Sequence, residues 1–110
     1  MRLNINYVKK DKSLVIQFTE EIDHHTTEKI RRRADYEIER YIPRKIIFDF
    51  NKVSFMDSAG IGLVLGRYKN AVALGAKVEI INVNEAVYKI LKMSGIIRLI
   101  PVKKEEIATC

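Results

Sequence analysis

The chain has 110 residues, of which 47% are hydrophobic, and its formal net charge is +6. This size allows one hydrophobic core but not two, so we expect a single domain spanning residues 1–110. No stretch reaches the roughly 20 apolar residues of a membrane span, and the first residues do not resemble a signal peptide. The only cysteine, Cys110, excludes an intrachain disulfide. We therefore expect a soluble, cytoplasmic protein that is a monomer when free and has no membrane partner.

The first two predicted elements are strands. Apolar residues alternate with their neighbours over residues 3–8 and again over residues 14–18, which is the period of two typical of β-strands. The turn-like sequence KKDK separates the two stretches. We therefore expect a β-hairpin.

A helix is predicted next. Apolar residues recur at helical spacing from Ile30 to Tyr41, and Pro43 follows. This spacing predicts a helix from about His24 to Tyr41, with Asp23 as its N-cap.

The second half of the chain alternates strands and helices. Residues 45–50 and 77–83 have the apolar content of buried strands. Between them, a helix is predicted to begin at Ser58 and to end near Gly75. Its expected core face consists of apolar residues at helical spacing: Ile61, Leu65, Tyr68 and Val72.

The last elements follow the second of these strands. A third helix, with Ala86, Ile90 and Met93 on its expected core face, is predicted to end at Gly95. Residues 96–102 then form a short apolar strand or extended segment, and residues 103–110 add a final helical turn.

The predicted order is therefore β-β-α-β-α-β-α, followed by a weaker strand or helix. Strands that alternate with helices favour a sheet with a parallel part. We expect an α/β fold with a mixed sheet of four to five strands, flanked by three to four helices.

The start of the second helix, in the stretch FMDSAGIGLVLGRYKN at 55–70, is the most informative feature. If Asp57 is the N-cap, Ser58 is the first helical residue and lies beside unpaired backbone N–H groups at the carboxyl end of a strand. Open α/β sheets usually carry their functional loops at this edge. Met56 can pack on Ile61 as a hydrophobic staple. The simpler alternative is that Asp57 and Ser58 only cap the helix.

Small residues and one leucine lie on the outer sides of this helix. Gly62 and Gly66 each destabilise a helix by roughly 1 kcal/mol relative to alanine, so something should require their small size. Together with Ala73 they form a smooth stripe, while Leu63 points to a third side. An apolar Leu63 near an exposed helix start indicates a docking surface. The alternative is that other elements of the chain cover Leu63.

Two binding alternatives remain open. Gly60, Gly62 and Gly66 follow a strand, and Glu79 lies on the next one, which resembles a dinucleotide fingerprint; the spacing, however, is G-x-G-x-x-x-G. The basic run 31–33 could contact phosphates of a nucleic acid, although acidic residues at helical spacing offer it local partners.

Catalysis and metal binding are not expected. Ser58 could pair with His24 or His25 and with Asp23, but the sequence G-x-S-x-G is absent. The two histidines are adjacent, so a helix would place them about 100 degrees apart, and no cluster of metal ligands lies around them in the sequence.

Three stretches of the chain resemble the STAS-domain anti-sigma factor antagonists, a family with members in sporulation. They are EIDHHT at 21–26, FMDSAGIGLVLGRYKN at 55–70, and MSG with the apolar pair after it at 93–97. With the matching element order, the resemblance covers nearly the whole chain. It implies a small mixed sheet flanked by helices and a regulatory binding protein rather than an enzyme.

The resemblance also implies a mechanism. Ser58 would be phosphorylated by an anti-sigma factor that is a serine kinase, and a serine phosphatase would reverse the modification. The unphosphorylated form would bind the kinase and release the sigma factor. The kinase uses Mg-ATP, so no cofactor is expected on this chain, and no direct contact with nucleic acid. Family members often carry a second serine or threonine where this chain has Ala59, which leaves Ser58 as the acceptor.

The expected partner contacts are Asp23, His24, Asp57, Ser58, Gly60, Ile61, Gly62 and Leu63. Two other functions remain as alternatives, a nucleotide-binding STAS-type regulatory module and a nucleic-acid-binding domain.

Overall fold

A computed structural model describes residues 3–19 and 22–106 of the chain. The strands are β1 (Leu3–Val8), β2 (Ser13–Phe18), β3 (Lys45–Asp49), β4 (Lys77–Val83) and β5 (Val102–Lys104). The helices are α1 (Thr27–Tyr41), α2 (Ser58–Ala73), α3 (Glu85–Ser94) and a short 3-10 helix (Ile96–Arg98). The predicted fold class is confirmed, with five strands and three α-helices in the described part of the chain.

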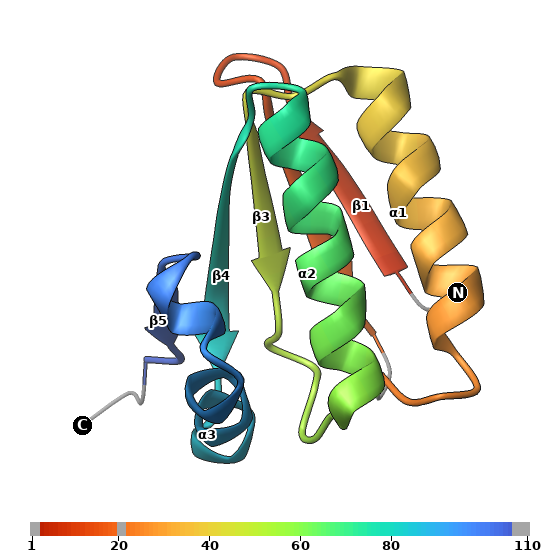
Figure 1. Ribbon diagram of the computed structural model, residues 1–110. Coiled ribbons are helices and arrows are strands. Elements are labelled where there is room, and N and C mark those ends of the chain that lie inside the picture. Colours follow the sequence, from red (N-terminus) through yellow and green to blue (C-terminus); the bar gives the residue numbers. More distant parts are fainter. Residues whose placement is uncertain (1–2, 20–21, 107–110) are drawn as a thin grey trace.

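The sheet has the strand order β1-β2-β3-β4-β5. The predicted hairpin is present, because β1 and β2 pair antiparallel through the turn at 9–12, while β2, β3, β4 and β5 pair parallel. Helices α1 and α2 lie side by side over one face of the sheet (Figure 1). The start of α2 and α3 lie toward the carboxyl ends of β3 and β4, so this edge holds the expected functional loop.

The two faces of the sheet differ in chemistry. Alternate residues of β2, β3 and β4 are buried in the core, among them Ile16, Phe48 and Ile80 with 0% exposure. On the other face a chain of side-chain hydrogen bonds crosses four strands. It runs from Asn4 to Gln17 (3.0 Å), from Gln17 to Asp49 (3.1 Å) and from Asn82 to Asp49 (3.0 Å). The helices therefore cover the apolar face, as the alternation in the strands requires.

Helix α1 begins three residues later than predicted. It starts at Thr27, and its N-cap position is Thr26 rather than Asp23. The reason is that the carbonyl and carboxylate of Asp23 both accept hydrogen bonds in a turn before the helix, which delays the first helical residue. The predicted end at Tyr41 is confirmed.

The predicted core face of α2 is wrong. Val72 is 53% exposed, and Ile61 and Tyr68 are only partly buried. The buried residues of the helix are Gly60, Leu63, Val64, Arg67 and Ala71. Apolar residues lie on several sides of this helix, so periodicity alone could not select the buried one; packing beside α1 does so.

The core face of α3 was also misassigned. Val87 and Leu91 are buried, whereas Met93 is 87% exposed and Ile90 is partly buried. The predicted end is confirmed, because Gly95 adopts a left-handed conformation (φ +85°) that residues other than glycine rarely take.

The segment after Gly95 is more compact than predicted. Residues 96–98 form a 3-10 helix in which Ile96 is buried, and Ile100 after it is buried too. The strand β5 comes only at residues 102–104, so it begins at the last residue of the predicted strand segment and continues for two residues into the segment in which a final helical turn was expected. Residues 107–110 lie outside the described part of the chain, so the rest of that prediction is untested.

Candidate functional site

The start of α2 has the predicted geometry. Asp57 is the N-cap, and its Oδ1 accepts a hydrogen bond from the backbone N–H of Ala59 at 2.9 Å. Ser58 is the first helical residue and is exposed. Within residues 3–19 and 22–106, no hydrogen-bond partner is found for its hydroxyl. The capping is therefore done by Asp57 alone, and the Ser58 hydroxyl is left accessible.

Gly60 holds the helix start against the core. A Cβ at this position would lie 2.9 Å from Sδ of Met56 and 3.3 Å from Cγ2 of Ile22. Gly60 is itself buried, so its small size serves packing inside the chain. The predicted partner contact at Gly60 stays a prediction. A parallel bridge between Ile22 and Met56 joins the two loops that precede α1 and α2.

The loop before α1 is held by Asp23. Its Oδ1 accepts hydrogen bonds from the backbone N–H groups of His25 (2.8 Å) and Thr26 (3.1 Å), and Oγ1 of Thr26 accepts one from the N–H of Asp23 (3.1 Å). Loss of hydration raises the pKa of the Asp23 carboxyl, but the two N–H groups outweigh this effect, so the pKa lies below its ordinary value. His24 and His25 are exposed. Because Ile22 and Met56 are bridged, this loop lies beside the one that leads to Ser58.

An apolar groove opens beside Ser58. It has a volume of about 430 Å³ and separates the first turns of α2 from α3. Its lining residues are Phe55, Met56, Asp57, Ser58, Ile61, Ile90, Met93 and Ser94, which together we call the apolar groove. Phe55 is 57% exposed and Met93 is 87% exposed, although both are large and apolar. A surface of this kind is typical of a protein-binding site.

Five lining residues of the apolar groove were not among the contacts predicted from the sequence: Phe55, Met56, Ile90, Met93 and Ser94. Ile90 and Met93 were assigned to the core, and Phe55 was not singled out. For Phe55, the available signal was its position shortly before the start of α2. For Met93 the apolar spacing gave no signal, because α3 carries apolar residues on two sides; Met93 does begin the stretch MSG that resembles the family.

A second groove lies on the other side of α2. It has a volume of about 220 Å³ and we call it the α1–α2 groove. Its lining residues are Thr27, Glu28, Arg31, Ala59, Gly62, Leu63 and Arg67. Leu63 is only 5% exposed, so the chain itself covers it. The prediction that Leu63 is an exposed docking residue is therefore wrong. Gly62 is exposed, and a Cβ there would meet no atom within 4 Å.

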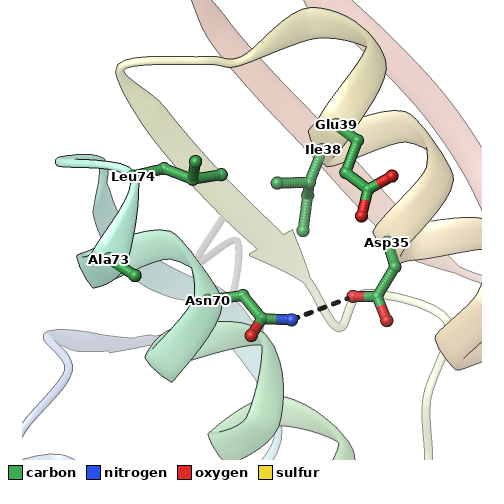
Figure 2. Close-up of a pocket in the computed structure, with 6 residues that line it drawn as sticks. All are labelled: Asp35, Ile38, Glu39, Asn70, Ala73 and Leu74. Atoms are coloured by element: carbon green, nitrogen blue, oxygen red, sulfur yellow. Dashed lines mark hydrogen bonds between the residues drawn. The ribbon is translucent and has the colours of Figure 1, made fainter.

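A third groove lies farther along the same two helices (Figure 2). It has a volume of about 270 Å³ and is lined by Asp35, Ile38, Glu39, Asn70, Ala73 and Leu74. These residues belong to the later turns of α1 and α2, away from Ser58, so this groove is not part of the site.

The charged residues that suggested nucleotide or nucleic-acid binding form ion pairs within the chain. Glu79 forms an ion pair with Lys45 (Nζ to Oε2, 3.3 Å) near the amino ends of β3 and β4, away from the glycines of α2. In the basic run, Arg31 and Arg32 both pair with Glu28, and Arg33 lies 3.9 Å from Glu37. The predicted local partners of this run are confirmed.

In the described part of the chain, no group of three or more His, Cys, Asp or Glu side chains is placed to hold a metal ion. Among those same residues no helix is both long and apolar enough to cross a membrane.

Comparisons with known proteins place this geometry in a family. Residues 4–107 match the STAS domain. The chain is 33% identical to the anti-sigma F factor antagonist of Paenibacillus polymyxa over 107 residues, which cover 97% of this chain and 92% of that protein. Its structure resembles that of the unphosphorylated anti-sigma factor antagonist SpoIIAA, with a TM-score of 0.78, 31% identity, and coverage of 94% and 89% of the two chains.

A further solved structure is that of phosphorylated SpoIIAA from Bacillus. Its TM-score is 0.70 at 30% identity, with coverage of 94% of this chain and 92% of that one. The match to the STAS domain spans most of the chain, and the identity to named antagonists exceeds 30% over nearly the whole length. The chain therefore belongs to the STAS-domain family of anti-sigma factor antagonists.

Proposed function

We propose that the chain is a partner-switching antagonist controlled by phosphorylation of Ser58. In its unmodified form it binds an anti-sigma factor that is also a serine kinase, and the sigma factor is released. The observation that carries the proposal is the exposed Ser58 hydroxyl at the rim of the apolar groove. The existence of SpoIIAA structures in both an unphosphorylated and a phosphorylated form supports it. Relatives named anti-sigma F factor antagonists are more similar to the chain (33% and 32% identity) than those named anti-sigma-B factor antagonists (24%), which favours a sigma F pathway.

The modification is a simple phosphoryl transfer to the chain. Oγ of Ser58 forms a bond to the γ-phosphorus of Mg-ATP held by the kinase, and the bond between that phosphorus and the bridging oxygen breaks as ADP leaves. The hydroxyl proton passes to a base of the kinase. A serine phosphatase later uses water to release inorganic phosphate and restore the hydroxyl. This chain supplies only the acceptor oxygen and its position.

The fold should tolerate the phosphate. A phosphoserine carries about −1.5 to −2 charges near neutral pH. At the N-terminus of a helix, the backbone dipoles stabilise an anion by roughly 0.3–1 kcal/mol. The neighbouring Asp57 carboxylate opposes this gain. Because Ser58 is exposed, the phosphate has room in solvent and the core is undisturbed.

Binding to the kinase should not tolerate the phosphate. Any partner that covers the apolar groove also covers Ser58 at its rim, and a buried dianion without a counter-charge is strongly unfavourable. A partner carboxylate about 6 Å away, at an effective dielectric near 20, would add roughly 3 kcal/mol per unit charge before screening by salt. Such an energy corresponds to about a hundredfold in affinity.

Apolar contacts would supply the affinity of the unmodified form. Phe55 and Met93 are exposed, and Ile61 and Ile90 are partly buried in the same groove. Full burial of a side chain of this size stabilises a complex by about 1.5–3 kcal/mol. We therefore assign these four residues as the main contacts of the kinase, together with Ser58.

Phosphorylation by the cognate kinase tests the proposal. The chain is incubated with this kinase and Mg-ATP, and its mass is measured. We expect a gain of one phosphate in the wild type and in Ser54→Ala, an exposed serine of the same loop, and no gain in Ser58→Ala. A wild-type chain that gains no phosphate, or a Ser58→Ala variant that still gains one, would contradict the proposal.

A further inference from the structure

One side of α2 is apolar along its whole length but is only partly buried. Its residues recur at helical spacing, so they share one side of the helix over about 16 Å. We call them the apolar strip: Ile61, Leu65, Tyr68 and Val72. The first three are partly exposed, and Val72 is 53% exposed. A long apolar side that stays partly exposed is typical of a contact with another protein.

The apolar strip connects two grooves. Ile61 lines the apolar groove beside Ser58. At the other end of α2 lies a groove of about 290 Å³, which we call the distal groove; it is lined by Tyr68 and Val72, by residues 76–78, and by Leu99 and Pro101. Both grooves lie on the side of α2 away from α1, toward α3 and β5 (Figure 1). The surface beside Ser58 therefore continues along the helix to its end.

The charges that flank the apolar strip are basic. Helix α2 and residues 86–104, which form its two sides, contain no aspartate or glutamate. They carry the exposed cations Lys69, Lys89 and Arg98, and the exposed Lys77 lines the distal groove. In the described part of the chain, none of these four cations forms an ion pair. This side of the molecule therefore offers unpaired positive charge beside an apolar surface.

The neighbouring carboxylates are engaged elsewhere. Glu79 alternates with the buried residues of β4, so it lies on the far face of the sheet, where it pairs with Lys45. Glu85, at the start of α3, pairs with Lys104 at 3.0 Å. Negative charge for the cations beside the apolar strip would therefore come from a partner.

Charge and shape select among the partners that could cover the apolar strip. In a two-fold contact between copies of this chain the same patch meets itself, so cations would face cations. An anionic membrane would suit the charge, but a flat bilayer surface does not fill a groove. A helix of another protein, with carboxylates beside its apolar side, fits both the charge and the shape.

We infer that an acidic amphipathic helix of the anti-sigma kinase lies along the apolar strip, from the apolar groove to the distal groove. The inference rests on the proposed function and extends its contact from the start of α2 to the end. A helix of about three turns matches the length of the strip. Its apolar side contacts Leu65, Tyr68 and Val72, and its carboxylates pair with Lys69 and Lys77. Because this contact does not include Ser58, it sets which kinase binds rather than which residue is modified.

Two substitutions in the last turn of α2 test the inference. Val72→Asp places a carboxylate in the apolar strip, while Ala73→Asp makes a matched change at the next exposed position, which does not line the distal groove. Both carboxylates lie at the same helix end, so their effects on the helix itself should be similar, and unfolding temperatures check this. Binding to the kinase is measured by titration calorimetry with a non-hydrolysable ATP analogue, so that Ser58 stays unmodified. We expect Val72→Asp to weaken binding by about tenfold or more and Ala73→Asp by less than about twofold. Equal effects of the two, or no effect of Val72→Asp, would overturn the inference.

The charge of the partner helix is tested separately. Lys69→Glu should weaken binding by about threefold or more and make it less sensitive to salt, because an attraction is replaced by a repulsion. Lys29→Glu makes the same change at an exposed position of α1 and should bind as the wild type does. An equal loss in both variants would mean that only the net charge matters, and the inference would fail.

The other two occupants give results of their own. Val72→Asp could leave kinase binding intact but abolish binding to phosphatidylglycerol vesicles, which would identify a membrane surface. It could instead abolish only a concentration-dependent dimer in sedimentation velocity, which would identify a contact between copies. Either result would overturn the inference.

Failure of the inference and failure of the proposed function look different. A wild-type chain that does not bind the kinase contradicts the proposed function and the inference with it. A wild-type chain that binds, beside a Val72→Asp variant that binds equally well, contradicts the inference alone.

Discussion

The two sides of the start of α2 are built from different kinds of side chain. Toward α3, the apolar groove presents Phe55, Ile61, Ile90 and Met93, and no charged lining residue except Asp57. Toward α1, the smaller α1–α2 groove presents ion pairs and a buried guanidinium. One side can contribute apolar burial to a complex, whereas the other carries charged side chains that are paired within the chain.

Ser58 lies where these two chemistries meet. It lines the apolar groove, and the next residue, Ala59, lines the α1–α2 groove. A phosphate at this position places negative charge next to a surface that has to lose water when a partner binds. The comparison teaches that a switch residue is effective at the rim of a binding surface, where a modification disturbs the contact but not the core.

Among the substitutions, the largest effect is expected when the apolar side is given a charge. Met93→Asp places a carboxylate in the apolar groove, so kinase binding should weaken by tens of fold, or about 2–3 kcal/mol. Because Met93 is 87% exposed, the unfolding temperature should change little. Met93→Leu keeps the apolar surface and should bind within a few-fold of the wild type. Calorimetric titration of both variants checks this, and equal binding by Met93→Asp would show that the apolar groove is not the docking surface.

A smaller effect is expected from the helix start that both grooves share. Gly60→Ala brings a Cβ to 2.9 Å from Sδ of Met56 and 3.3 Å from Ile22. Overpacking of this kind destabilises a protein by about 1–3 kcal/mol. Urea unfolding of Gly60→Ala beside Gly66→Ala, whose Cβ meets nothing, measures the difference. A Gly60→Ala variant as stable as the wild type would mean that Met56 and Ile22 are free to move.

The smallest effect concerns the loop that leads to α1. The pKa of Asp23 is lowered in the folded chain, so its ionised carboxylate contributes stability above the ordinary pKa of an aspartate. This contribution is lost as the pH falls through the lowered pKa. The unfolding temperature of wild type should therefore exceed that of Asp23→Asn at neutral pH, and the two should converge in acid. A difference that stays constant with pH would show that the charge of Asp23 does not matter.

Much of the fold could be predicted because its local signals agree with its packing. Alternation in β2 and the apolar run of β3 identify buried strands, and Gly95 ends α3 as expected. The N-cap at Asp57 was predictable because capping depends on neighbours in sequence. These features need no knowledge of distant contacts.

The buried sides of α2 and α3 could not be predicted in the same way. Both helices carry apolar residues on more than one side, so the pattern left Leu63 and Met93 ambiguous. Packing against α1 buries Leu63 at 5% exposure, while nothing in the described chain covers Met93. Long-range pairs such as Arg67 with Asp35 leave no mark in local spacing. The apolar groove and the α1–α2 groove are thus products of tertiary packing.

The most direct test of the account compares one chain in two states. The same preparation, unmodified or quantitatively phosphorylated at Ser58, is titrated with the cognate anti-sigma kinase, and the unfolding temperature of each form is recorded. We predict that phosphorylation weakens binding about a hundredfold or more while the unfolding temperature shifts by only a few degrees. Equal affinity of the two forms, or a loss of affinity that comes only with unfolding of the domain, would contradict the account.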